Sequence, residues 1–215
     1  MSQVLLLVAK DLRLEWRSRE IVISMGLVAL LLVVVLAAAR AEASLTPAAM
    51  WVTYAFGAAV GFARMFATER DPLTAVLLAP VDRSSIYAAK VVANWLAIAV
   101  VQVASLPLFG ALFTEAVWTH LPALALPLLL GGLSLAVVGT LFSALIVQTR
   151  LRDALLPLLM LPVMLPALIA AVGATTGILE GQPLAAVAVH LRLLAAFDML
   201  FAAAGMLLFE VLISE

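Results

Sequence analysis

Few residues of this chain are of the types that carry out chemistry, and no catalytic arrangement joins them. The sequence has no cysteine and two histidines, and it contains neither an HExxH zinc motif nor a Gly-x-Ser-x-Gly nucleophile elbow. It also lacks the GxxxxGKS/T loop that cradles phosphates, since its two lysines, Lys10 and Lys90, lie outside glycine-rich turns. We therefore expect no enzyme activity, no ATP site, and no resident metal or cofactor in this chain.

Asp198 is the most unusual candidate, because it lies in a long apolar run between Phe197 and Met199. A carboxylate in hydrocarbon costs several kcal/mol unless it is protonated, paired or hydrated. We expect Asp198 to face other helices or a dimer interface. Its role is open between a structural one, near the outer headgroups and next to Arg192, and one in substrate passage or coupling.

Three prolines, Pro157, Pro162 and Pro166, interrupt another apolar run. Each removes a backbone donor, so the sequence predicts a kinked or broken helix, either as a fixed bend or as a moving part. Two glycine pairs have the GxxxG spacing that lets helices approach closely. They are Gly57 with Gly61 and Gly173 with Gly177, and they indicate packing within one protomer or between two.

The elements that must position these residues are membrane-spanning helices. Of the 215 residues, 66% are hydrophobic and 12% charged, about half the charge of a soluble domain. A span needs about 20 apolar residues, and the chain supplies six such runs. The predicted fold is an all-α integral membrane protein with a single domain, 1–215, and spans at about 21–39, 48–67, 91–113, 121–149, 154–179 and 193–209.

The distribution of basic residues predicts how the six spans are oriented. Ten of the twelve Lys and Arg residues fall on one side of the membrane, within residues 1–20, 64–90 and 150–152. The positive-inside rule makes that side cytoplasmic. Both termini are therefore expected in the cytoplasm, and residues 1–20 are expected to form an amphipathic interfacial helix that leads into the first span.

Residues 69–90 form the longest predicted cytoplasmic loop. Asp71 followed by Pro72 is typical of a helix start, and Pro80 would end the short helix. Its charged and apolar positions are Glu69, Arg70, Asp71, Leu73, Val76, Leu77, Pro80 and Arg83. This pattern is consistent either with a connector lying on lipid headgroups or with a docking element for a soluble partner.

Four segments, in order along the chain, resemble the haem exporter B family, the CcmB-type permease of cytochrome c maturation. They are KDLRLEWRSRE (10–20), ERDPLTAVLLAPVDRSSIYAAKVVAN (69–94), LLPLLMLPVMLPALIAAV (155–172) and AFDMLFAAAGMLLFEVLISE (196–215). The resemblance implies a type 2 ATP-binding-cassette (ABC) permease in the bacterial inner membrane. It would act as a homodimer driven by a separate ATPase subunit, into which the 69–90 loop would insert.

The resemblance also implies further partners, namely a haem-handling membrane subunit and a haem chaperone at the outer face. It leaves open whether haem itself is exported or whether ATP serves to release haem-loaded chaperone. His120 and His190, both expected on the outer face, are candidate haem contacts. Membrane lipids are expected around the chain. A nucleic-acid partner is not expected.

The sequence allows three alternatives to a permease of cytochrome c maturation to be considered. A membrane acyl or phosphoryl transferase would need a cluster of polar catalytic groups, which the sequence does not offer. A scaffold that assembles other subunits without moving anything would need the same docking loop. A permease of the same architecture could carry another amphiphile, such as a polysaccharide lipid or a drug.

Overall fold

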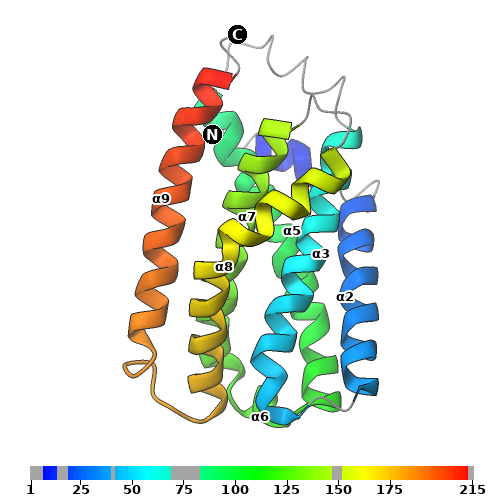
Figure 1. The fold of residues 1–215 in the computed structure, drawn as a ribbon, viewed down its shortest axis with the longest axis vertical. Helices are drawn as coiled ribbons and strands as arrows, with labels where there is room; N and C mark the ends of the chain where they lie inside the picture. Colours follow the sequence, from blue (N-terminus) through cyan, green and yellow to red (C-terminus); the bar gives the residue numbers. More distant parts are fainter. Residues whose placement is uncertain (1–6, 14–18, 40–41, 69–82, 147–151, 213–215) are drawn as a thin grey trace.

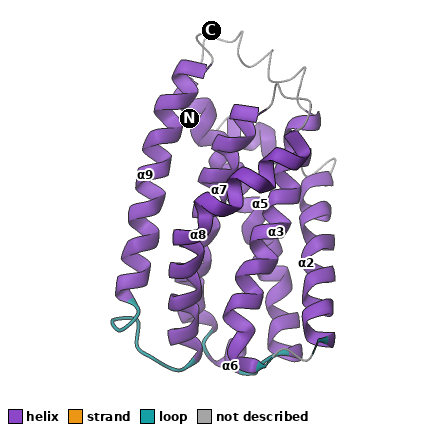
Figure 2. Cartoon of the chain, viewed as in Figure 1, coloured by secondary structure: helices purple, strands orange, loops and turns teal. Residues whose placement is uncertain are grey.

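Six long helices lie side by side in the computed structural model, which describes residues 7–13, 19–39, 42–68, 83–146 and 152–212 (Figure 1). All six are long and apolar enough to cross a membrane. Within the described part of the chain every regular element is a helix, as Figure 2 shows. The predicted fold class, an all-helical membrane protein with six spans, is confirmed.

The spanning helices begin and end close to the apolar runs, with two differences. Helix α5 begins at Arg83 rather than at Val91, and α9 begins at Ala188 rather than at Leu193, because a helix continues beyond the hydrocarbon into polar residues that hydropathy does not mark. The long helices are α2 (Glu20–Ala38), α3 (Thr46–Thr68), α5 (Arg83–Leu112), α7 (Leu121–Ile146), α8 (Arg152–Leu179) and α9 (Ala188–Leu212). Shorter helical elements are residues 7–13, η1 (Ala43–Leu45) and α6 (Ala116–Thr119).

Helix α7 is the centre of the bundle, where it packs against α3, α5, α8 and α9. Nearly every residue between Gly131 and Leu141 is buried, so the helix has no lipid-facing side over that length. Helices α2 and α9 are the least buried spans, and they expose residues such as Leu31 and Leu207. An apolar surface of this kind faces lipid or another subunit in a membrane protein.

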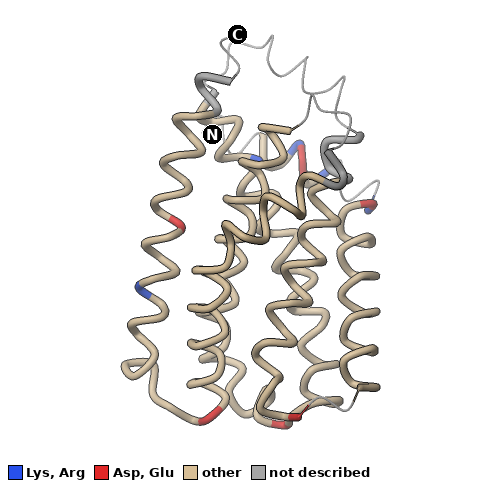
Figure 3. Tube along the Cα trace, viewed as in Figure 1, with Lys and Arg blue, Asp and Glu red and all other residues tan. Residues whose placement is uncertain are grey.

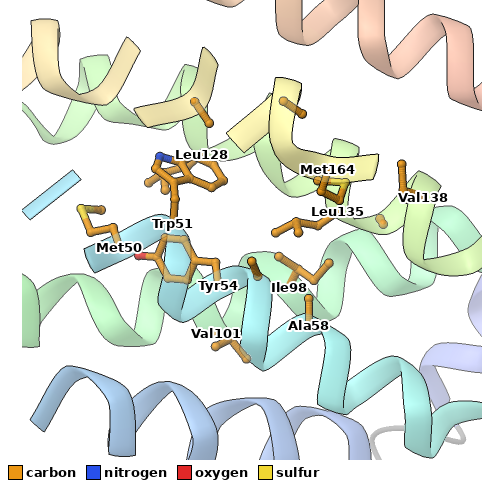
Figure 4. Close-up of a cluster of buried hydrophobic side chains, with 14 of the residues drawn as sticks. Met50, Trp51, Tyr54, Ala58, Ile98, Val101, Leu128, Leu135, Val138 and Met164 are labelled. Atoms are coloured by element: carbon orange, nitrogen blue, oxygen red, sulfur yellow. The ribbon is translucent and has the colours of Figure 1, made fainter. Parts of the chain in front are cut away.

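Aromatic rings packed on glycines bring the helices close together. Trp51 in α3 lies against Gly131 in α7, and Phe62, three turns further along α3, lies against Gly139. Figure 4 shows Trp51 and Tyr54 among buried side chains from α3, α5, α7 and α8. Since lipid is as apolar as the core, such close packing and interhelical hydrogen bonds must hold the bundle together.

The two ends of the bundle differ in charge (Figure 3). We call the end that holds helix 7–13 and the starts of α2 and α5 the basic end; Lys10, Arg13, Arg19 and Lys90 lie there. The opposite end, which we call the acidic end, holds Glu42, Glu115 and Glu180 in the connections before α3, α6 and α9. Helix α9 finishes at the basic end, so the chain enters and leaves the bundle at the same end (Figure 1).

Candidate functional site

The predicted docking loop connects α3 to α5 at the basic end of the bundle. Helix α3 ends at Thr68 and α5 begins at Arg83, so the connection leaves and returns on that end. Of the loop residues singled out from the sequence, Arg83 is the first residue of α5. The others lie outside the described residues: Glu69, Arg70, Asp71, Leu73, Val76, Leu77 and Pro80.

Asp198 is buried between α9 and α7, with 4% of its surface exposed. Ser134 in α7 donates a hydrogen bond to Asp198 Oδ1, and the Ser134 hydroxyl also lies 3.3 Å from the Leu130 carbonyl oxygen. Asp198 Oδ2 has no hydrogen-bond partner within the described part of the chain. The carboxyl group therefore faces the inside of its own bundle, and its neighbours Met199 and Leu200 point outward.

The depth of Asp198 differs from the headgroup position considered from the sequence. Because α9 begins at Ala188, Asp198 lies ten residues into the helix, or about 15 Å along its axis. Its partner Ser134 lies midway along α7, so the pair is near the middle of the length of the bundle. A hydroxyl partner at this depth supplies a donor that lipid cannot, which favours a role inside the bundle.

Further polar pairs join other helices of the bundle, and sequence reasoning missed them. Asn94 in α5 donates to Thr140 Oγ1 in α7 at 2.8 Å. Trp51 Nε1 in α3 donates to Thr175 Oγ1 in α8 at 2.9 Å. The available signal was the presence of single polar residues inside apolar runs, since such residues in spans face the bundle interior and pair with one another.

The three prolines all lie inside α8, which stays helical from Arg152 to Leu179. Figure 1 shows the helix changing direction between an oblique half towards the basic end and a half that runs along the bundle axis. Met160 and Met164, which lie among these prolines in the sequence, are fully buried. The structure therefore has a kinked α8 rather than a broken one, in keeping with the loss of backbone donors at Pro157, Pro162 and Pro166.

The two histidines lie at different places near the acidic end. His120, between α6 and α7, places Nδ1 3.0 Å from the Ala116 carbonyl oxygen and 2.9 Å from Thr119 Oγ1. His190, in the first turn of α9, packs on Gly173 in α8. Among the residues that the structure describes, no group of three or more His, Cys, Asp or Glu side chains could hold a metal ion.

Contacts within the protomer fill the faces of the GxxxG glycines. A Cβ added at Gly57 would lie 3.2 Å from the Met25 carbonyl oxygen, and one at Gly61 would overlap the Met25 side chain. A Cβ at Gly173 would meet the His190 ring, and one at Gly177 would meet Val187. These glycines therefore serve packing inside one chain, which was one of the two roles expected.

A protein-family comparison covers nearly the whole chain. The family model described as CcmB protein matches residues 2–209, a range that includes all six spans and the connection between α3 and α5. No curated protein matches the chain. The match, six spanning helices and the four ordered segments together show that the chain belongs to the CcmB family, a permease component of the cytochrome c maturation ABC transporter, which works with an ATPase partner.

Proposed function

We propose that this chain couples ATP hydrolysis by its partner subunit to haem export or to the release of haem-loaded chaperone. The observation that carries the proposal is the α3–α5 connection at the basic end of the bundle. It is the longest connection between two spans, and it carries charged residues at Glu69, Arg70 and Asp71. The absence of a phosphate-binding loop from the sequence supports assigning ATP hydrolysis to the partner and no enzyme activity to this chain.

The basic end is proposed to face the cytoplasm of the bacterial inner membrane. Lys and Arg residues gather in cytoplasmic connections because the orientation of spans follows the positive-inside rule. An ATPase that uses cytoplasmic ATP would then meet the α3–α5 connection directly. The acidic end would face the outside, where the haem-handling membrane subunit and the haem chaperone are proposed to bind.

A homodimer is part of the same proposal. Helices α2 and α9 leave most of their apolar surface uncovered within one chain, and residues such as Leu27 and Leu200 are more than 60% exposed. Covering part of this surface with a second copy would remove it from lipid contact. The rest would remain against membrane lipids, which accept apolar side chains without cost.

Charge reversal in the connection tests the coupling. The triple variant E69K/R70E/D71K is purified in complex with the ATPase subunit, and nucleotide hydrolysis is compared with the unmodified complex. We expect the chain to insert normally and stimulation of hydrolysis to fall by about tenfold or more, since reversed charges at a protein interface cost several kcal/mol. The matched control, E42K/E115K/E180K, reverses three charges at the acidic end and should leave stimulation unchanged.

Three results would count against the proposal. Full stimulation by the E69K/R70E/D71K complex would show that this connection does not dock the ATPase. A complex in which the unmodified chain never responds to nucleotide would favour a scaffold over a coupling subunit. A purified ATPase complex with polysaccharide or drug machinery would keep the permease and change its substrate.

A further inference from the structure

The amino-terminal helix of the chain is attached to the bundle rather than lying free of it. Within helix 7–13, Val8 is buried and Leu7 packs against the hydrophobic core. Leu12 is on the outer side and is 37% exposed. The helix therefore places Leu7 and Val8 on the basic end of the bundle, whereas Leu12, which helical spacing puts on the same face as Val8, is exposed.

An ion pair joins this helix to the third span. Lys90 lies two turns into α5, and its side chain is 5% exposed. Its Nζ is 3.8 Å from Asp11 Oδ2, and the Asp11 side chain is 12% exposed. Lys10, in contrast, is 39% exposed although it is 3.2 Å from the same carboxyl group. Asp11 thus pairs with one lysine that is shielded from water and with one that is not.

The same turns of α5 are tied to two other helices. Tyr87, one turn before Lys90, donates a hydrogen bond to the Val137 carbonyl oxygen in α7 at 3.1 Å, and its ring packs against Gly205 in α9. Asn94, one turn after Lys90, is bonded to Thr140 in α7. These positions, about seven residues apart, lie on one stripe of α5. The start of α5 is therefore a junction between helix 7–13, α7 and α9.

We propose that the Asp11–Lys90 pair makes helix 7–13 a part of the coupling unit, so that it moves together with the start of α5 when the ATPase acts. The inference rests on the proposed function, because α5 is the helix that follows the docking connection. When a lysine and a carboxylate that are both shielded from water separate, they lose an attraction that is strong in a medium of low dielectric constant. Displacement of α5 must then carry the amino-terminal helix with it.

Paired neutral substitutions test the ion pair without reversing any charge. The variants are D11N and K90M, and K10M is the matched control, because it removes the exposed partner of Asp11. Each is made in the full-length chain with Val8→Cys as a reporter, because Val8 is buried against the bundle while the helix is attached; the chain has no cysteine of its own. The rate at which a membrane-permeant maleimide labels this position reports detachment of helix 7–13, whichever way the bundle is oriented.

In D11N and K90M we expect the labelling rate to rise by about tenfold or more, since breaking a shielded pair is strongly destabilising. The K10M control should change labelling by less than about threefold, as exposed pairs contribute little. In the complex with the ATPase subunit, D11N and K90M should lose most of the stimulated hydrolysis. The exchanged variant D11K/K90E should recover at least half of both properties.

Unchanged labelling in both D11N and K90M would overturn the ion pair as the tie between helix 7–13 and α5. Raised labelling with full ATPase stimulation would overturn the coupling role while leaving the tie intact. If the unmodified complex shows no stimulation at all, the proposed function fails, and the labelling result still decides whether the pair holds the helix. Recovery in D11K/K90E separates loss of the pair from misfolding of the single variants.

Discussion

Ser134 in α7 donates a hydrogen bond to Asp198 in α9, and both side chains are buried near the middle of the bundle. The two helices run in the same direction, and α9 is one of the least covered spans. Interhelical hydrogen bonds between transmembrane helices contribute about 0.6 to 2 kcal/mol each. The pair therefore fixes the rotation of an outer helix whose remaining surface is mostly apolar.

We predict that Asp198→Asn keeps both stability and ATPase stimulation close to the unmodified level, because the amide oxygen can accept the Ser134 hydrogen bond. Ser134→Ala and Asp198→Leu remove the bond and should lower the free energy of unfolding by about 1 kcal/mol. Thermal unfolding in detergent, monitored by helix content, measures the difference. A variant Asp198→Asn that is stable but no longer stimulates the ATPase would instead assign the carboxyl group to coupling or substrate passage.

Glycine-to-alanine substitutions should distinguish two effects on stability, the loss of close helix packing and the gain in helix propensity. A Cβ at Gly139 would overlap the Phe62 ring, so Gly139→Ala forces α3 away from α7 and should destabilise the bundle by about 1 to 3 kcal/mol. Gly26 in α2 has nothing within 4 Å of an added Cβ. Gly26→Ala should therefore be neutral or slightly stabilising. Equal melting temperatures for the Gly139→Ala and Gly26→Ala variants would contradict the close packing of Phe62 on Gly139.

The hydrogen bond between Trp51 and Thr175 gives a third prediction. Thr175→Val keeps the side-chain volume but leaves the buried Trp51 Nε1 without its acceptor, which should cost about 1 to 2 kcal/mol of stability. Thr176→Val, at the neighbouring and less buried position, is the control and should cost less than about 0.5 kcal/mol. If Trp51→Phe abolishes the effect of Thr175→Val, the loss comes from this bond.

Single cysteines should report which end of the bundle faces the cytoplasm. Ser84 lies at the basic end in the first turn of α5, and Thr119 lies in α6 near the acidic end and is exposed. An outside-only thiol reagent applied to intact cells with a permeabilised outer membrane should label Thr119→Cys and leave Ser84→Cys unmodified. Labelling in permeabilised inner membranes controls for reactivity, and the opposite pattern would reverse the proposed orientation.

The sequence was sufficient to predict six spans because the bilayer sets their length and hydropathy marks their apolar part. It did not predict that α9 begins at Ala188, since polar residues such as Arg192 belong to the helix as well. For that reason the distance of Asp198 from Leu193 along the sequence did not show that its partner lies midway along α7. A helix boundary depends on hydrogen bonding of the backbone, whereas hydropathy reports only the surrounding solvent.

The residue pairs that join the helices could not be predicted from a single sequence either. Asp198 stood out as a buried carboxyl group, but nothing in its neighbourhood identified Ser134, which is 64 residues earlier in the chain. Asp11 and Lys90 were each visible as charged residues in segments of interest, but their proximity depends on how helix 7–13 packs on α5. The glycine spacing likewise allowed two kinds of interface, and contacts within the chain, such as Met25 against Gly57 and Gly61, decide between them.

The central position of α7 has a consequence for biosynthesis. Helix α7 is the fourth of the six spans, so α3 and α5 enter the membrane before the surface of α7 on which they pack exists, whereas α2 packs on α3 and α5. Until then Trp51 and Phe62 lack the glycines Gly131 and Gly139 on which they pack. A nascent chain that stops before residue 121 can therefore pack α2 against α3 and α5, but it lacks the central helix of the bundle, which α3, α5, α8 and α9 share.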